Sequence, residues 1–174
     1  MAYSLYDARD ADAPRALGSV VETDRGSLPF ALIHGEALVA CAAWALGDAG
    51  VTAVDLGTSW SDVVEAGELF VLHDPLCPMT PANFIAACVE RALERDQVVV
   101  GVRPGQDGRT TVASPIVLPS SAVASLDGLP TLEFPALVEF LRARFAVEPV
   151  EAPAGADRVA SEADVRELEA RTAR

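Results

Sequence analysis

The sequence predicts one α/β domain, a mostly parallel β-sheet with helices on both faces. Continuous apolar runs at 69–72 and 98–102 are typical of strands that are covered on both sides. Between them, residues 80–95 repeat apolar side chains at helical spacing. The chain has 174 residues, 51% of them hydrophobic, which suits one domain with a full core. Strands that alternate with helices favour a doubly wound, mostly parallel sheet.

The N-terminal third predicts a leader, a strand, a helix and a second strand. Residues 1–15 are rich in Ala and Asp and are expected to be partly ordered, so the domain spans 16–174. We expect the first strand at 16–21 and the first helix at 36–46. Gly47 and Gly50 punctuate the end of that helix, and a strand at 51–56 follows.

The central part of the sequence predicts a buried strand that ends in two polar residues. After a short turn at 61–66, residues 69–72 form a buried strand that ends in His73 and Asp74. Thr80 is expected to cap the following helix, with Pro81 in its first turn. From sequence alone, Asp74 either caps the loop before the next proline or binds a ligand.

The C-terminal half predicts a hairpin and two further helices. A strand at 98–102, a turn at 104–108 and a returning strand at 110–118 form a protruding β-hairpin arm. Residues 105–109 favour a plain hairpin turn over an anion cradle. A helix at 135–145, a strand at 147–150 and a final helix opened by a capping box of Ser161 and Asp164 complete the list.

The charge composition argues against several classes of partner. The chain has no lysine, and its formal net charge is -13 at pH 7. Such a charge repels phosphate backbones, so neither nucleic acid nor an anionic membrane surface is expected as a partner. The apolar runs are too short to span a bilayer, and the acidic N-terminus lacks the basic stretch of a secretion signal. These features favour a cytoplasmic protein.

The cysteines and the first histidine suggest no independent catalytic centre. Cys41, Cys77 and Cys88 show no C-x-x-C spacing, which argues against a disulfide framework or a zinc site. Cys41 and Cys88 lie on apolar helix faces, whereas Cys77 lies between prolines and is expected to be the accessible thiol. His34, beside Gly35, is interpreted as a turn residue rather than a catalytic base.

The order of several short motifs resembles a known enzyme family. A strand ends in His-Asp-Pro-x-x-Pro at 73–78, a helix starting with Thr-Pro and a valine-rich strand follow, and residues 157–165 read Asp-Arg-Val-Ala-Ser-Glu-Ala-Asp-Val. Together with the stretch 32–38, this order resembles the 2-C-methyl-D-erythritol 4-phosphate cytidylyltransferase family over residues 27–170. That family consists of nucleotidyltransferases with a Rossmann-like sheet.

The resemblance implies a set of candidate nucleotide-binding residues. Asp74 takes the place of the carboxylate that approaches magnesium and the triphosphate of CTP, which makes it the candidate metal ligand. Arg158 stands where the family has a phosphate-binding lysine, and Arg25 is the cation that remains in the first loop. His73 would mainly shape the exit of its strand.

The departures from the family pattern predict a protein that has lost catalysis. The first loop carries Glu22 and Asp24, where the family has a glycine-rich, cationic segment that binds the triphosphate. The stretch 57–68 is too short for the family's base-reading segment, and Cys77 replaces an arginine. We therefore expect a degenerate cytidylyltransferase-like binding or assembly module with no catalytic residues.

The alternative is a reduced nucleotidyltransferase that uses Arg25, Asp74 and Arg158 to transfer CMP to a sugar- or polyol-phosphate, with Mg²⁺ and CTP as cofactors. The resemblance also implies dimerisation through the arm, here 103–129, which contains the apolar run 115–118. The sequence thus predicts a homodimer, or a heterodimer with an intact homologue.

Overall fold

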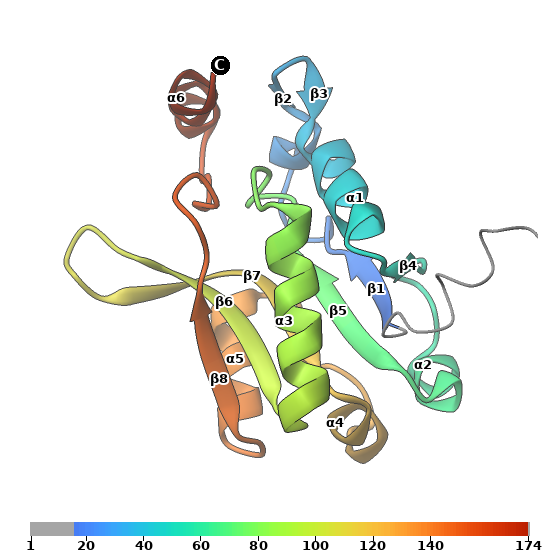
Figure 1. Cartoon of the computed structure of the whole chain (residues 1–174). Helices are drawn as coiled ribbons and strands as arrows, with labels where there is room; N and C mark the ends of the chain where they lie inside the picture. Colours follow the sequence, from blue (N-terminus) through green and yellow to red (C-terminus); the bar gives the residue numbers. More distant parts are fainter. Residues whose placement is uncertain (1–15, 174) are drawn as a thin grey trace, which may run out of the picture.

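A six-stranded mixed sheet forms the centre of the computed structural model, which describes residues 16–173 (Figure 1). Its spatial order is β4-β1-β5-β7-β6-β8, and only β7 runs antiparallel to its neighbours. The predicted, mostly parallel sheet is thereby confirmed, while the predicted leader, 1–15, lies outside the described residues. The strands are β1 (Ala16–Val20), β4 (Thr52–Ala53), β5 (Leu69–His73), β6 (Val98–Pro104), β7 (Thr110–Leu118) and β8 (Val147–Glu151).

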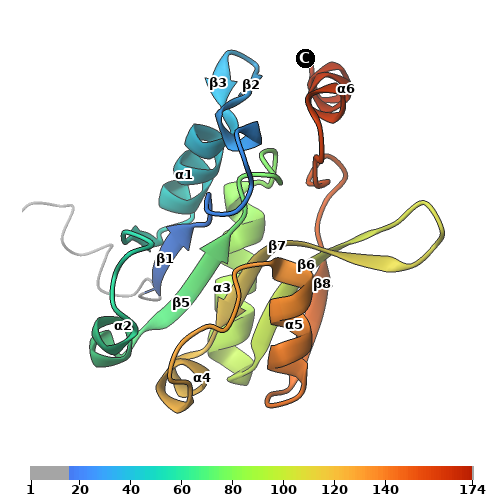
Figure 2. The same ribbon diagram turned by 180° about the vertical axis from the view of Figure 1, so that it is seen from behind.

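Helices cover both faces of the sheet, because side chains of the central strands alternate between two apolar clusters. In β5, Phe70 and Leu72 point to one cluster, and Leu69 and Val71 to the other. Helices α1 (Leu38–Asp48) and α3 (Ala82–Arg95) cover one face. Helices α2 (Trp60–Ala66), α4 (Ser120–Ser125) and α5 (Phe134–Arg142) cover the other (Figures 1 and 2).

A third apolar cluster joins the two ends of the domain. The small hairpin of β2 (Leu32–Ile33) and β3 (Glu36–Ala37), which follows the 3-10 turn η1 (Leu28–Phe30), packs against α6 (Glu162–Thr172). Neither η1 nor this hairpin was predicted from the sequence. His34 and Gly35 form the tip of the hairpin with φ angles of 50° and 82°, which confirms the turn predicted there.

The arm is present, but its apolar part is not available to a partner. The hairpin of β6 and β7 extends away from the sheet (Figure 2), and Gly105 N donates to Arg109 O across its turn at 2.6 Å. The predicted hairpin turn is thus confirmed. The run 115–118 lies inside the sheet between β5 and β6, where Ile116 and Leu118 are fully buried. Its assignment to an exposed arm was wrong, because β7 continues from the arm into the core.

Some predicted boundaries also need correction. Thr80 does not cap α3; its hydroxyl donates to Cys77 O at 2.8 Å, and the N-cap residue is Pro81. The strand expected at 51–56 is reduced to β4. The turn expected at 61–66 is the helix α2, which is capped by Ser59.

At the final helix the capping prediction is confirmed, because the Ser161 hydroxyl accepts from Asp164 N at 3.2 Å. The Asp164 carboxylate in turn accepts from Ala160 N. Within residues 16–173, no helix has the length and apolar character needed to cross a bilayer.

Candidate functional site

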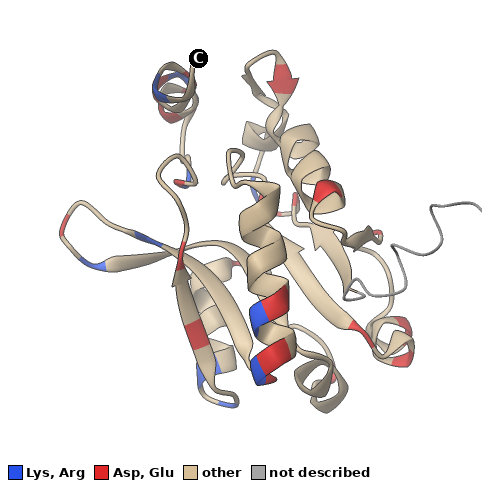
Figure 3. Ribbon diagram, in the orientation of Figure 1, with Lys and Arg blue, Asp and Glu red and all other residues tan. Residues whose placement is uncertain are grey.

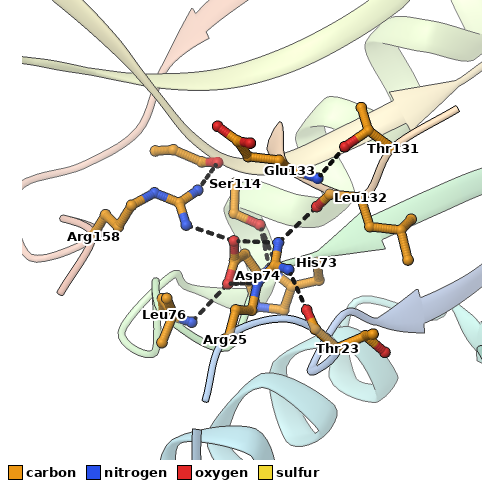
Figure 4. A network of polar contacts seen from close by, with 11 residues as sticks. Thr23, Arg25, His73, Asp74, Leu76, Ser114, Thr131, Leu132, Glu133 and Arg158 are labelled. Carbon is orange, nitrogen blue, oxygen red and sulfur yellow. Dashed lines mark hydrogen bonds and ion pairs between the residues drawn. The ribbon is translucent and has the colours of Figure 1, made fainter. Parts of the chain in front are cut away.

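The three residues predicted to bind a nucleotide meet at one edge of the sheet (Figure 4). Asp74 directly follows β5, Arg25 lies in the segment after β1, and Arg158 lies in the segment after β8. Strands β1, β5 and β8 all run in the same direction, so their carboxyl ends reach the same edge. In open α/β sheets this edge is the usual place for ligands.

The Asp74 carboxylate is completely enclosed by hydrogen-bond donors. Its Oδ1 accepts from Arg25 Nε at 3.0 Å and from Leu76 N at 2.9 Å. Its Oδ2 accepts from Arg25 Nη2 at 3.0 Å and from Arg158 Nη1. A carboxylate offers about four acceptor sites, and all of them are used here. The Asp74 side chain is fully buried, so it has neither a free lone pair nor access to solvent.

The two arginines are anchored by the protein as well. Arg25 donates to the carbonyl oxygens of Thr23 and Leu132 at 2.7 and 2.9 Å, and its side chain is only 8% exposed. Arg158 donates to Ala113 O at 3.2 Å. Both guanidinium groups lie over the ring of Phe134, with Cζ 5.5 and 5.6 Å from its centroid. Each arginine is therefore held in one position by several partners.

Electrostatics keep this cluster charged and closed. Burial alone would raise the pKa of Asp74, but hydrogen bonds from Arg25 and the charge of Arg158 outweigh it and hold the pKa below its ordinary value. A neighbouring pocket of about 450 Å³ is lined by both arginines but also by Asp24 and Glu133. Two guanidinium groups thus face three carboxylates, which leaves no excess positive charge to attract a phosphate.

A buried His–Ser pair supports the position of Asp74. Ser114 Oγ lies 2.6 Å from His73 Nδ1 and accepts from Asp74 N at 3.0 Å. His73 is fully buried, and its Nε2 has no partner among the residues that the structure describes. Burial lowers the pKa of His73 to about 4, although the charge of Asp74 opposes the shift. The imidazole is therefore neutral near pH 7, and it lies buried at the end of β5.

Ser114 was missed because nothing in an apolar strand marks one serine as important. The neighbouring strand makes room for Ser114, since a Cβ on Gly101 would collide with the Ser114 carbonyl. The glycine in the valine-rich strand was the available signal.

The prediction for Cys77 was wrong. Its side chain is completely buried, and burial raises the pKa of the thiol to about 12, so it is not a reactive group. Cys88 is buried as expected, with its pKa also raised to about 12 by burial. The loop between the prolines folds inward, since Thr80 and Val159 both bond to its backbone.

A second cluster of arginines and a carboxylate lies between the arm and α6. Asp157 accepts from Arg103 Nε at 3.0 Å and from Arg171 Nη1 at 3.3 Å. The cluster lines a pocket of about 570 Å³, which Arg158 also borders. This cluster was not predicted, because its members are distant from one another in the chain.

The described residues do not fit a magnesium ion at Asp74. Mg²⁺ needs free oxygen ligands, and those of Asp74 are all bonded to arginine and backbone nitrogen. Within 16–173 no group of three or more His, Cys, Asp or Glu side chains is arranged to hold a metal. The predicted ligand roles of Arg25, Asp74 and Arg158 stay predictions.

Comparison with solved structures identifies the fold. The 4-diphosphocytidyl-2C-methyl-D-erythritol synthase from Anaerococcus prevotii superimposes with a TM-score of 0.66 at 11% identity, over 94% of this chain and 100% of the other. The 2-C-methyl-D-erythritol 4-phosphate cytidylyltransferase from Thermus thermophilus gives 0.62 at 21% identity, over 90% and 98%. No protein-family model and no curated protein matches the sequence.

A CMP:2-keto-3-deoxy-manno-octonic acid synthetase complexed with CTP is similar too, with a TM-score of 0.59 at 11% identity over 92% of this chain and 99% of the other. The class defined by these likenesses is the nucleotidyltransferase-like α/β fold. More narrowly, this chain has the fold of the cytidylyltransferases, as its motif order indicated. At these identities the comparison shows the fold, and the activity must be argued from the site.

Proposed function

We propose that this protein is a catalytically inactive cytidylyltransferase-like module that acts by binding or assembly. One observation carries the proposal: all four acceptor sites of Asp74 are occupied by Arg25, Arg158 and the backbone. The charges that a nucleotide would need are thus neutralised within the protein.

Phosphoryl transfer depends on fixed cations that stabilise the negative charge of the transferred phosphoryl group in the transition state. The chain has no lysine, and both arginines near Asp74 are bonded to it. Glu133 and Asp24 add negative charge to the adjoining pocket. A triphosphate entering there would have to displace a buried ion pair and approach two further carboxylates, which is unfavourable on both counts.

Calorimetric titration with CTP and Mg²⁺ tests the proposal. We expect no binding in the micromolar range and no pyrophosphate release. Micromolar binding together with pyrophosphate release in the presence of a sugar- or polyol-phosphate would overturn the proposal.

Asp74→Asn is the matched variant for this titration, because it keeps the size of the side chain and removes the charge that holds the arginines. If Asp74 closes the site, the folded variant binds inorganic phosphate more tightly than the parent does. Circular dichroism establishes that the variant is folded. Equal phosphate affinity in the two folded proteins would show that Asp74 does not close the site.

The second candidate function is a reduced nucleotidyltransferase that transfers CMP to a sugar- or polyol-phosphate with Mg²⁺ and CTP. The convergence of Arg25, Asp74 and Arg158 beside a pocket of about 450 Å³ favours it. In that case, Asp74→Ala abolishes a measurable activity. An unchanged rate in this variant would refute the hypothesis that the protein is an enzyme of this type.

Assembly through the arm of β6 and β7 is part of the proposal, either as a homodimer or as a heterodimer with an intact homologue. The protrusion of the hairpin supports it (Figure 1). Because residues 115–118 are buried, the dimer contact would be made by the polar tip of the arm at 104–110. Light scattering that gives only the monomer mass at high concentration counts against the homodimer. We also propose a cytoplasmic location, which the three free cysteines support.

A further inference from the structure

Helix α1 has an apolar face that nothing in the described chain covers. Its residues from Leu38 to Gly47 are all uncharged and mostly apolar, yet only the side with Leu38, Ala42 and Leu46 is buried. On the opposite side Ala43 is exposed, and Trp44 is 69% exposed. A helix that is apolar on every side is normally buried on every side. An exposed tryptophan on such a helix indicates a contact surface.

This face combines a projecting side chain with a hollow. Trp44 borders a shallow depression of about 470 Å³, which is lined otherwise by Ala40, Ala43, Gly47 and Asp48. The small residues stand at spacings of three and four, so they form one groove along the helix. Because the projection and the groove share one face, this surface can fit a copy of itself.

Charge indicates the kind of partner. The chain carries a formal net charge of -13, but the only charged residue of α1 is Asp48 at its end (Figure 3). Two copies repel each other least across this uncharged face. A charged protein would gain nothing from it, and an anionic bilayer would find no basic residue in the helix. A second copy is therefore the favoured occupant.

We propose that two copies of this chain pair through α1, antiparallel, about a two-fold axis between Ala43 and Trp44. In that register Trp44 of each copy lies on Ala43 of the other, and Ala40 lies opposite Gly47. Each indole then fills the groove left by the small residues of the facing helix. The surface is separate from the hairpin arm and does not depend on the proposed function of the Asp74 site.

The helix ends complement each other only in this orientation. Asp48 lies at the C-terminus of α1, where the helix dipole disfavours a negative charge and no basic residue compensates. The N-terminus has Ala37 as its cap, with no side-chain cap and no acidic residue in the first turn; the exposed Glu36 precedes the cap and belongs to β3. In the antiparallel pair, Asp48 of one copy faces Val39 in the first turn of the other. A carboxylate that is unfavourable within its own helix becomes favourable across the pair.

Sedimentation velocity over a range of concentrations tests the pairing. In the Arg109→Glu variant, which alters the tip of the arm, we expect a reversible monomer–dimer equilibrium, and adding Trp44→Ala raises its dissociation constant at least about thirtyfold, as removal of a central aromatic residue does. Leu93→Ala is the matched control, since Leu93 is 54% exposed on α3 and lies outside the groove. A monomer at every concentration, or a dimer indifferent to Trp44→Ala, overturns the inference.

Two further variants separate this interface from its alternatives. Asp48→Lys is expected to raise the melting temperature of the monomer and to weaken the dimer, because a lysine suits its own helix end but not the facing N-terminus. Unchanged or tighter association would refute the antiparallel register. Arg109→Glu alters the tip of the arm; a dimer abolished by it and retained in Trp44→Ala would assign association to the arm and refute the α1 interface.

Discussion

Two clusters in this protein are each centred on one carboxylate, and they adjoin in the sequence at Asp157 and Arg158; in the second cluster, Arg103 also pairs with Glu151 at 3.7 Å. In each, one carboxylate binds two arginines. Asp74 is 0% exposed, with arginines 8% and 30% exposed. Asp157 is 31% exposed, and its arginines, Arg103 and Arg171, are 16% and 52% exposed.

Burial, rather than the number of ion pairs, decides how much each cluster contributes to stability. At the Asp74 cluster, charges removed from water depend on each other, so losing one partner leaves an uncompensated buried charge. At the Asp157 cluster, water replaces a lost partner at little cost. In both, burial would raise the pKa of the carboxyl, and arginine contacts lower it below its ordinary value. The pKa is therefore lowered in both carboxyl groups, but the contribution to stability is larger at the buried Asp74 than at Asp157.

Asp74→Asn is expected to change the free energy of unfolding more than any other variant that distinguishes the two clusters. Removing the charge leaves Arg25 buried without its counter-ion, which should lower the free energy of unfolding by about 3–5 kcal/mol. Urea denaturation monitored by circular dichroism measures this change. A loss below about 1 kcal/mol would show that the buried cluster behaves like a surface one.

The next effect is a pH dependence that belongs to the buried cluster alone. The pKa of His73 is lowered to about 4 in the folded state from an ordinary 6.5, so the unfolded chain binds the extra proton between these values. Stability therefore falls as the pH drops from about 6.5 to 4, by about 2–3 kcal/mol. Asp74, whose pKa is also lowered, loses its contribution only further down, as the pH falls through its folded pKa.

Urea midpoints at pH 7 and pH 4.5 check this slope in the parent and in one variant. His73→Gln should flatten it, because it removes the group whose pKa is lowered on folding. A slope that persists in His73→Gln would mean that another group takes up the proton.

A smaller effect reaches the buried cluster from the neighbouring strand. A methyl group in Gly101→Ala collides with the Ser114 carbonyl and should displace the hydroxyl that holds Asp74 N. We expect a loss of about 1–3 kcal/mol, typical of overpacking. Thermal unfolding gives the loss. The rate of amide hydrogen exchange at Asp74 should rise as well. Unchanged exchange there would show that the packing defect at Gly101 does not disturb the Asp74 cluster.

The smallest effect is expected for Asp157→Asn, at most about 1 kcal/mol. Because its arginines are partly exposed, raising the salt concentration should shrink the difference between parent and variant. A cost equal to that of Asp74→Asn, independent of salt, would erase the distinction between the two clusters.

Much of the fold could be predicted, since local patterns decide it. The apolar run of β5, the helical stripe of α3 and the cap at Ser161 depend on neighbours in the chain, and each was found within a few residues. The exits of β1, β5 and β8 could be matched to a family order, so Arg25, Asp74 and Arg158 were named before their contacts were known. The inward fold of Cys77, the burial of 115–118 and the role of Ser114 depend on distant segments and were missed.

An acidic α/β domain with a sheet covered on both faces follows from the sequence alone, because hydrophobic spacing and turn residues act over short distances. The identity of the few cations that remain near the end of β5 follows from it as well. The pairing of these cations with Asp74, which leaves no excess positive charge in the pocket that they line, depends on the tertiary structure. The strength of a charge and the choice of its partner depend on how much water its surroundings exclude, and residues from the whole chain make up those surroundings.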